Sequence, residues 1–539
     1  MNHLYYGDCL DVLQNSAEVA DESIDLVYID PPFNSKRNYN VLFESIDMTD
    51  TKAQKEAFAD TWSNIKYIDQ LDTIHGMQLG LWRFLDSINR APIAKSYVAY
   101  LTTMALRISL IHRKLKSTGS FYLHCDQTMS HYLKIVCDLV FGEKSFRNEI
   151  IWKRKTGRGE TQHKSFRYGI CTDTILFYTK GDKCTFNTQF GESNEEYLTT
   201  SFNHVDSFGR RYMIDNLASP SLRPNLIYEY KGYKPPAKGW AISKETMEKW
   251  DAEGKLHFPD NKGGRIRRIR YLDEVKGHPI QNLWDEFPAI GSQSKERLHY
   301  QTQKPEALLE RIIGTSSNEG DLVADFFCGC GTAVAVAERL KRRWIGVDIS
   351  HLAVRLIYNR VLDPYRGKNG RMKEIKDNIE ITGFPRDVAS ARELAEGTKK
   401  GRIKFQDWVI EFMMDGVSNP KKVGDGGYDG YLSLYRDEKV RDIVLIEVKS
   451  GSLTVKNIRE FVHVIDHEKA AIGVFVCFAD QVTKPMRTEA QQAGYYDYEG
   501  FKTQFPRIQI LTVEELLEGK TVSHPNPAMF NVTFKKAYK

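Results

Sequence analysis

The sequence predicts an α/β protein: a main domain with a doubly wound, largely parallel sheet, followed by a smaller α/β domain. Strand-like and helix-like segments alternate from residue 3 to about 141, which is the order of β-α-β units. A strand, a glycine turn, a helix and a second strand follow at 321–349. A new helix and two apolar strands after residue 404 indicate the separate domain.

Composition bounds the class of protein. The chain has 539 residues, 41% of them hydrophobic, and a net charge of +5, so a nucleic-acid surface must be a local patch rather than a global field. No apolar run approaches the roughly 18 residues that span a bilayer, and the first residues show neither the basic nor the apolar region expected of a signal peptide. Only Cys328 and Cys330 lie close together among the cysteines, so no disulfide framework or zinc site is expected. We therefore expect a cytoplasmic protein without a membrane partner.

The first motif ends an apolar run that begins at Leu26 and reads as a buried parallel strand. Two prolines stiffen the chain as it leaves the carboxyl end of that strand, where open α/β sheets bind ligands. The Asp30 carboxylate and the Pro31 carbonyl offer two acceptors to a planar amine, and the ring of Phe33 after Pro32 offers a stacking face. The alternative is a strand-ending turn with a solvated aspartate.

The second motif is a glycine turn between two strands. Gly329 and Gly331 allow a tight turn and a close approach to a ligand. Asp348 ends the next strand, about 20 residues beyond the turn, where an acid can hold two ribose hydroxyls. Val334 stands where a dinucleotide-binding turn has its third glycine, which favours a nucleoside ligand without a pyrophosphate.

Basic and aromatic residues interleave between the two motifs. They gather around residues 152–168, 231–240 and 262–270. Three such clusters in one region predict phosphate and base contacts with double-stranded DNA, whereas any one of them alone is more often a solvated surface. The aromatic residues considered for these contacts include Trp152, Tyr168, Tyr233 and Trp240.

Together, the two motifs resemble those of DNA amino-methyltransferases that use S-adenosylmethionine (AdoMet), over about residues 1–370. Residues 325–332 resemble the AdoMet loop of that family, and residues 30–33 resemble its catalytic motif. Residues 300–306 are similar to its T-Q-K-P element, which packs beside the methionine end of the cofactor. The motif order is that of the β group, and residues 299–362 especially resemble modification subunits of type III restriction systems.

The resemblance implies site-specific methyl transfer from AdoMet to adenine N6, because an acid before Pro-Pro is typical of adenine-N6 enzymes and a serine of cytosine-N4 enzymes. Cytosine-N4 specificity is the alternative. The target base would be everted from the duplex and stacked on Phe33. The implied catalytic residues are Asp30, Pro31, Pro32 and Phe33, and the implied cofactor-binding residues are Asp8, Gln303, Lys304, Pro305, Asp325, Phe327, Gly329, Gly331, Thr332 and Asp348.

The C-terminal third contains a glycine-rich hairpin followed by an apolar strand. Glu447 and Lys449 share one face of that strand, and Asp429 in the hairpin can join them. Two carboxylates and a lysine suit a Mg²⁺ site that positions water for phosphodiester hydrolysis. Residues 400–518 resemble the Mrr-like branch of PD-(D/E)-x-K nucleases, which implies Asp429 and Glu447 as Mg²⁺ ligands and Lys449 as the third nuclease residue. The alternative is a domain that binds DNA or a partner without cutting.

Domain boundaries follow from these motifs. We expect a catalytic half at 1–150, an inserted target-recognition region at 151–298, an AdoMet-binding half at 299–375, a linker at 376–404 and a restriction-endonuclease-like domain at 405–539. The resemblance implies a role in restriction-modification or phage defence and a homodimer. No complete P-loop occurs, so ATP-driven movement would need a separate helicase–nuclease subunit.

Overall fold

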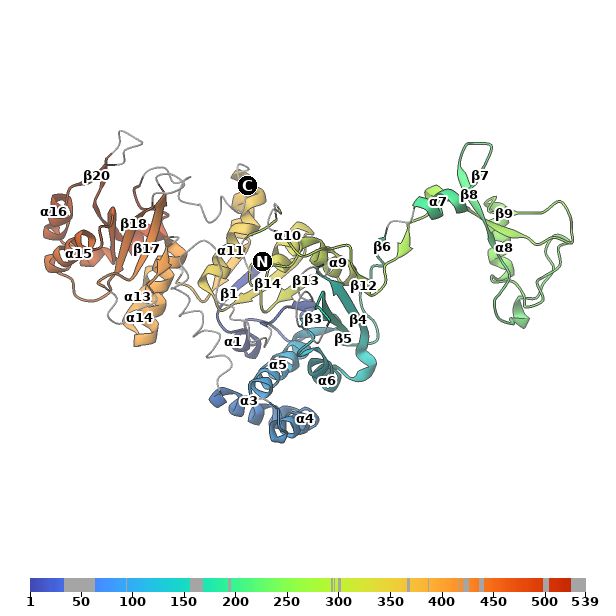
Figure 1. The fold of residues 1–539 in the computed structure, drawn as a ribbon, viewed down its shortest axis with the longest axis horizontal. Coiled ribbons are helices and arrows are strands. Elements are labelled where there is room, and N and C mark those ends of the chain that lie inside the picture. Colours follow the sequence, from blue (N-terminus) through green and yellow to red (C-terminus); the bar gives the residue numbers. More distant parts are fainter. Residues whose placement is uncertain are drawn as a thin grey trace. The chain divides into compact units, whose positions relative to one another are not determined.

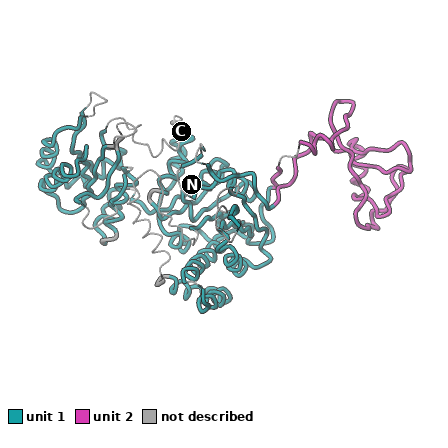
Figure 2. Tube along the Cα trace, viewed as in Figure 1, with its two compact units in different colours: residues 1–187, 282–539 teal, residues 188–281 magenta. Residues whose placement is uncertain are grey.

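The chain forms two compact units in the computed structural model. One unit comprises Met1–Asn187 and Asn282–Lys539, and the other comprises Thr188–Gln281 (Figure 2). The structure describes residues 1–32, 64–93, 95–155, 168–191, 195–291, 294, 296–298, 302–365, 369–385, 387–414, 416–419, 426–435, 441–497 and 504–524.

A nine-stranded sheet is the centre of the first unit, in the order β12-β4-β5-β3-β2-β13-β14-β1-β15 (Figure 1). All neighbours from β3 to β15 are parallel, whereas β5 is antiparallel to β3 and β4. This confirms the predicted doubly wound α/β fold, which is Rossmann-like. The strands are β1 (Asn2–Tyr6), β2 (Ile24–Ile29), β3 (Leu115–Cys125), β4 (Phe146–Lys153), β5 (Thr172–Thr179), β12 (Leu283–Trp284), β13 (Leu322–Asp325), β14 (Arg343–Asp348) and β15 (Ile379–Thr382).

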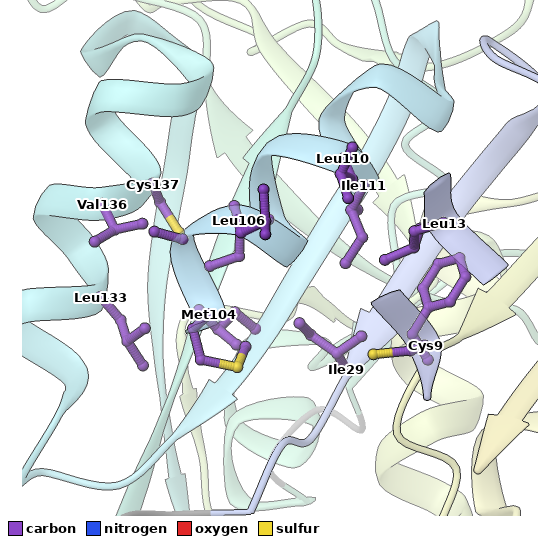
Figure 3. Close-up of a cluster of buried hydrophobic side chains, with 14 of the residues drawn as sticks. Cys9, Leu13, Ile29, Met104, Leu106, Leu110, Ile111, Leu133, Val136 and Cys137 are labelled. Atoms are coloured by element: carbon purple, nitrogen blue, oxygen red, sulfur yellow. The ribbon is translucent and has the colours of Figure 1, made fainter. Parts of the chain in front are cut away.

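Helices cover this sheet, and side-chain alternation along β2 separates its two faces. Val27 and Ile29 belong to the large apolar core, and Figure 3 shows Ile29 among side chains of the neighbouring helices, including Leu13 and Ile111. Tyr28 therefore points to the opposite face. The helices of this part are α1 (Cys9–Gln14), α3 (Asn64–Met77), α4 (Leu79–Arg90), α5 (Lys95–Lys114), α6 (Ser130–Phe141), α9 (Glu306–Ser316), α10 (Thr332–Arg339), α11 (His351–Leu362) and α12 (Asn369–Asp377).

The second unit has its own four-stranded sheet, in the order β7-β8-β10-β9, and its own small core. The inserted region was expected to begin at residue 151, whereas the second compact unit begins at Thr188. The reason is that the apolar strands β4 and β5 pair into the large sheet. The elements here are β6 (Phe190–Gly191), α7 (Glu195–Ser201), β7 (His204–Val205), β8 (Arg211–Asn216), α8 (Lys244–Ala252), β9 (Leu256–His257), β10 (Arg267–Tyr271) and β11 (His278–Pro279).

Three aromatic residues considered for base contacts are buried, so that interpretation of them was wrong. Trp240 is inaccessible and its indole N–H donates to the Tyr228 carbonyl at 2.8 Å. Tyr233 is buried in the same core. Trp152 is buried in the large sheet, where its indole N–H donates to the Phe287 carbonyl at 2.7 Å. These rings stabilise the fold, and none of them has an open face for a base. Tyr168, in contrast, is exposed.

The C-terminal region has a five-stranded sheet in the order β16-β17-β18-β19-β22. Residues 376–404, expected as a linker, contain strand β15 and helix α13. No helix of the described residues is long and apolar enough to cross a membrane. The elements are α13 (Val388–Glu396), α14 (Lys399–Asp407), a π-helix (Trp408–Met413), β16 (Val417–Ser418), β17 (Gly430–Tyr435), β18 (Arg441–Val448), α15 (Val455–His467), β19 (Ile472–Cys477), α16 (Lys484–Gln492), β20 (Tyr495–Asp497), β21 (Gln504–Pro506), β22 (Ile508–Thr512) and α17 (Val513–Leu517).

Candidate active site

Four acidic residues follow adjacent parallel strands and meet at one edge of the large sheet. Asp30 follows β2, Asp325 ends β13, Asp348 ends β14 and Asp8 follows β1. These strands are neighbours in this order, with Ala324 paired to both Val27 and Ile345. The two sequence motifs are therefore parts of one site, at the edge where doubly wound sheets bind ligands.

The glycine turn is fixed by the two aspartates that flank it. The Phe327 N–H donates to Asp325 Oδ1 at 2.9 Å, and the Gly329 N–H donates to Asp348 Oδ2 at 2.8 Å. Gly331 has a φ of 72°, and a Cβ there would lie 2.6 Å from Ile357 Cγ1. Only glycine fits both requirements. The turn leads directly into α10.

Burial controls the charge of these two aspartates. Burial, followed by the charges of Asp30 and Asp348, raises the pKa of Asp325 to about 8. Burial also raises the pKa of Asp348, but only to about 6, because the N–H groups of Ser350 and Gly329 oppose the rise. Asp348 is therefore the more acidic of the two, which makes it the stronger acceptor for a hydroxyl group at neutral pH.

Lys304 lies against the predicted catalytic acid. Its Nζ forms an ion pair with Asp30 Oδ2, and both side chains are largely buried. Gln303 instead binds its own loop: its Nε2 donates to the Glu296 carbonyl at 2.6 Å, and its Oε1 accepts from the Leu298 N–H at 2.7 Å. Pro305 precedes the first turn of α9. Of these three residues, Lys304 is the one whose side chain contacts the predicted catalytic acid.

Asp8 is anchored by a buried arginine. Arg107 Nη2 lies 2.6 and 3.0 Å from the two oxygens of Asp8, and the Leu10 N–H donates to Asp8 Oδ1 at 2.9 Å, which caps α1. The preceding Gly7 donates its N–H to the Asp348 carbonyl at 3.0 Å. Asp8 therefore lies beside Asp348, and its carboxylate is partly exposed at the sheet edge.

A chain of polar residues that begins at Tyr28, two residues before Asp30, was not expected from the sequence. The Tyr28 hydroxyl lies 3.2 Å from His124 Nδ1, His124 Nε2 lies 3.3 Å from Asp173 Oδ2, and Arg154 Nε lies 3.1 Å from Asp173 Oδ1. Burial would raise the pKa of Asp173, but His124, Arg154 and Lys304 together lower it. Polar residues inside apolar strands were the available signal, because such groups are retained only when they find partners.

Phe33 lies outside the described residues, so its stacking role stays a prediction. Pro31 and Pro32 follow Asp30 directly in irregular structure, and Pro31 is buried.

A family profile described as DNA methylase, of the N6/N4 methyltransferase type, matches residues 24–359. The chain belongs to this DNA methylase family. The match begins at β2 and ends in α11, so it includes both halves of the site.

The relatives of this methylase come from restriction-modification systems, among others. Type II methyltransferase M.EcaI of Enterobacter cloacae is 33% identical over 49% of this chain and 57% of its own. The StyLTI Mod subunit, a type III restriction-modification enzyme of Salmonella typhimurium, is 27% identical over 60% of this chain and 48% of its own. DNA adenine methyltransferase YhdJ of Escherichia coli is 26% identical over 66% of this chain and 82% of its own. The methylase thus spans about half the length of the first two relatives.

The C-terminal region of the methylase places the three expected nuclease residues near one end of β18. Asp429 Oδ2 accepts from the Val448 N–H at 2.8 Å, and Lys449 Nζ lies 2.9 Å from Glu447 Oε1. The structure adds Gln406 of α14, whose Nε2 donates to Asp429 Oδ1 at 2.9 Å. This glutamine was not among the residues expected from the sequence.

The expected Mg²⁺ finds no support in this arrangement. No group of three or more His, Cys, Asp or Glu residues that could hold a metal ion occurs in the part of the chain that the structure describes. Both Asp429 oxygens accept N–H donors, and Glu447 is paired with Lys449. A family profile described as NACHT-associated inactive restriction endonuclease matches residues 403–518.

Proposed function

We propose that this chain transfers a methyl group from AdoMet to adenine N6 at specific sites in double-stranded DNA, as part of restriction-modification or phage defence. The observation that carries the proposal is the position of Asp30 at the same sheet edge as the glycine turn. AdoMet, when bound, supplies the methyl group on a sulfonium. The Asp348 carboxylate suits its ribose hydroxyls, and the turn at Gly329 and Gly331 gives the close backbone approach that a nucleoside needs.

The chain's contribution to the reaction is to position the target amine. The Asp30 carboxylate and the Pro31 carbonyl accept the two N–H groups of the amine, which favours a pyramidal nitrogen with a localised lone pair. Eversion of the base costs a few kcal/mol and exposes the amine to these acceptors. The amine releases one proton on methylation, which the Asp30 carboxylate that already accepts its N–H can take and pass to water. No strongly basic group is needed, so most of the catalysis comes from orientation.

The identity of the modified base is tested by its product. Incubation of the chain with methyl-labelled AdoMet and bacterial DNA, followed by nucleoside mass spectrometry, is expected to yield N6-methyladenine. An acid at position 30 supports this, as does the likeness to a protein named as a DNA adenine methyltransferase. Detection of N4-methylcytosine alone would replace the adenine proposal by the cytosine one.

Substitution of the catalytic acid tests the site itself. Asp30→Ala is expected to lower kcat by at least about 100-fold, because it removes one acceptor of the transition state, while AdoMet affinity stays within about threefold. Asp25→Asn is the matched control, because Asp25 lies near the other end of the same strand and pairs with Lys116 there. Full activity of Asp30→Ala would refute the proposed site.

For the C-terminal region we favour a non-cleaving module that binds DNA or a partner. The match to a family described as an inactive restriction endonuclease supports this over the Mg²⁺-dependent nuclease expected from sequence. Methylated and unmethylated DNA incubated with the chain and Mg²⁺ should remain intact. If the wild-type chain cleaves DNA and the Glu447→Ala variant does not, the region is a Mg²⁺-dependent nuclease as the sequence predicted.

The partners are part of the same proposal. We propose a homodimer and a separate helicase–nuclease subunit, as the motif resemblance implies, and the likeness to a protein named as a type III restriction-modification Mod subunit supports the restriction-modification setting. Light scattering of the purified chain tests the homodimer. Co-purification of an ATPase with the chain from its native cells tests the helicase–nuclease subunit.

A further inference from the structure

Lys304 is a buried cation held in place from both ends. Its ammonium contacts Asp30 Oδ2, and only 10% of the Lys304 side chain and 14% of the Asp30 side chain are exposed. Its backbone carbonyl accepts from the Thr332 hydroxyl at 3.3 Å, and that hydroxyl in turn accepts from Arg360 Nη1 at 3.1 Å. The loop before α9 is therefore tied to the first turn of α10, and the lysine reaches from there to the catalytic acid.

The surroundings of the ammonium are acidic on more than one side. Besides Asp30, its charge lowers the pKa of Asp173 on β5 and opposes the rise in the pKa of Asp325 on β13. Asp30, which the ammonium contacts, follows β2, and β2 lies between β13 and β3 in the sheet. A strongly hydrated ammonium is buried only where such partners replace its water.

We propose that Lys304 is a positioning residue for methyl transfer, which holds Asp30 Oδ2 so that Oδ1 faces the target amine together with the Pro31 carbonyl. This inference rests on the proposed function. The T-Q-K-P resemblance implies a cofactor contact for this lysine, whereas its side chain contacts the acid. A charge-assisted hydrogen bond of this kind is about twice as strong as a neutral one, and it fixes the plane of the carboxylate.

The expected effect is on turnover rather than on cofactor binding. Without the ammonium, the Asp30 carboxylate can rotate, and a displacement of about 1 Å in a positioning group can lower a rate by about 100-fold. The Lys304→Met variant of the full chain keeps the length of the side chain and removes its charge. We expect its kcat to fall by about 100-fold, with the AdoMet Kd from calorimetry within about threefold of wild type.

Rescue by arginine separates positioning from simple packing. Lys304→Arg restores a donor to the carboxylate and is expected to regain about tenfold or more of the lost kcat, because a guanidinium also pairs with a carboxylate. Lys116→Met is the matched control. Lys116 pairs with Asp25 at 2.7 Å near the opposite end of β2, away from the site, so its kcat is expected to match wild type.

Two results would overturn the inference. One is a kcat of Lys304→Met within about threefold of wild type. The other is an AdoMet Kd raised about 100-fold with an unchanged kcat at saturation, which would make Lys304 a cofactor ligand. Should Lys304→Met fail to fold, Lys304→Gln and Lys304→Arg give the same comparison. A wild-type chain that methylates no DNA refutes the proposed function instead, which keeps the two failures distinguishable.

Discussion

Asp325 and Asp348 lie at the ends of neighbouring strands, yet their pKa values differ. Both are buried, but Asp348 accepts N–H donors on both oxygens, from Gly329 and Ser350. Asp325 accepts one from Phe327 and is repelled by Asp30 and Asp348. The difference in pKa, about 8 against about 6, thus follows from the hydrogen bonds that each receives and from neighbouring charge.

This difference predicts how stability changes with pH. In the unfolded chain Asp325 regains its ordinary pKa of 3.8, against about 8 in the fold. Its protonated form therefore stabilises the fold fully below pH 3.8, and that contribution is lost as pH rises toward 8. Asp325→Asn keeps the acceptor and removes the titration. Its melting temperature relative to wild type should increase from pH 5 to pH 8, with at most about 1.4 kcal/mol gained per pH unit.

The control for this prediction is an aspartate whose pKa is shifted in the opposite direction, downward. A hydrogen bond from Lys114 lowers the pKa of Asp21. The effect of Asp21→Asn on the melting temperature should therefore be constant between pH 5 and pH 8, because Asp21 stays charged there in both states. A constant difference for Asp325→Asn as well would show that Asp325 is ionised in the fold.

The glycine turn before α10 is the element on which we expect cofactor binding to depend most. Gly331 and Gly320 both have a positive φ, of 72° and 85°. A Cβ at Gly331 would meet Ile357, whereas a Cβ at Gly320 would meet nothing within 4 Å. Gly320→Ala should therefore cost about 1–2 kcal/mol of stability from backbone strain alone. Gly331→Ala should cost roughly 2–4 kcal/mol and weaken AdoMet binding, because a steric clash is added.

Urea unfolding of the two variants and calorimetry with AdoMet check this comparison. Equal losses of stability in both variants would mean that α10 moves away from Ile357 without penalty. An AdoMet affinity unchanged in Gly331→Ala would mean that the turn does not approach the cofactor.

The sequence predicted those elements whose signal is local. The apolar run that ends at Asp30 and the glycines at 329 and 331 carry their own pattern, so both motifs were placed correctly on one α/β fold. The partner of Lys304 could not be predicted in this way, because it depends on which strands become neighbours. The contact between His124 and Asp173 could not be predicted either, because the two side chains meet only after β3 and β5 pair.

Burial of the aromatic residues was also beyond the sequence. Trp240 and an exposed tryptophan look alike in a basic, polar segment, and only packing against Met247 and Ile266 decides between them. Strand pairing was beyond composition too: the inserted region was expected from residue 151, but β4 and β5 pair into the large sheet, so the compact unit begins at Thr188.

At the scale of the whole molecule, the second unit is the candidate DNA-recognition region, but several of its cations make contacts within the unit itself. Lys262 lies 3.9 Å from the centre of the Tyr233 ring, Arg268 lies 4.1 Å from that of Trp250, and Arg210 pairs with Asp273 at 2.8 Å. Arg265 and Arg267 are exposed. They are therefore the cations of this cluster that we expect to contact phosphates.

Removal of these two charges should weaken DNA binding in a salt-dependent way and leave the chemistry intact. For Arg265→Ala/Arg267→Ala we expect the negative slope of log K for DNA binding against log salt to become shallower by about 1.8. The reason is that each lost phosphate contact releases about 0.9 fewer counterions. The KM for DNA should rise, while kcat at saturating DNA and the AdoMet Kd stay unchanged. Arg210→Ala is the matched control, since its charge is already paired and its loss should leave the slope unaltered. If the double variant keeps the wild-type slope, these arginines do not contact DNA, and the phosphate contacts must come from another part of the chain.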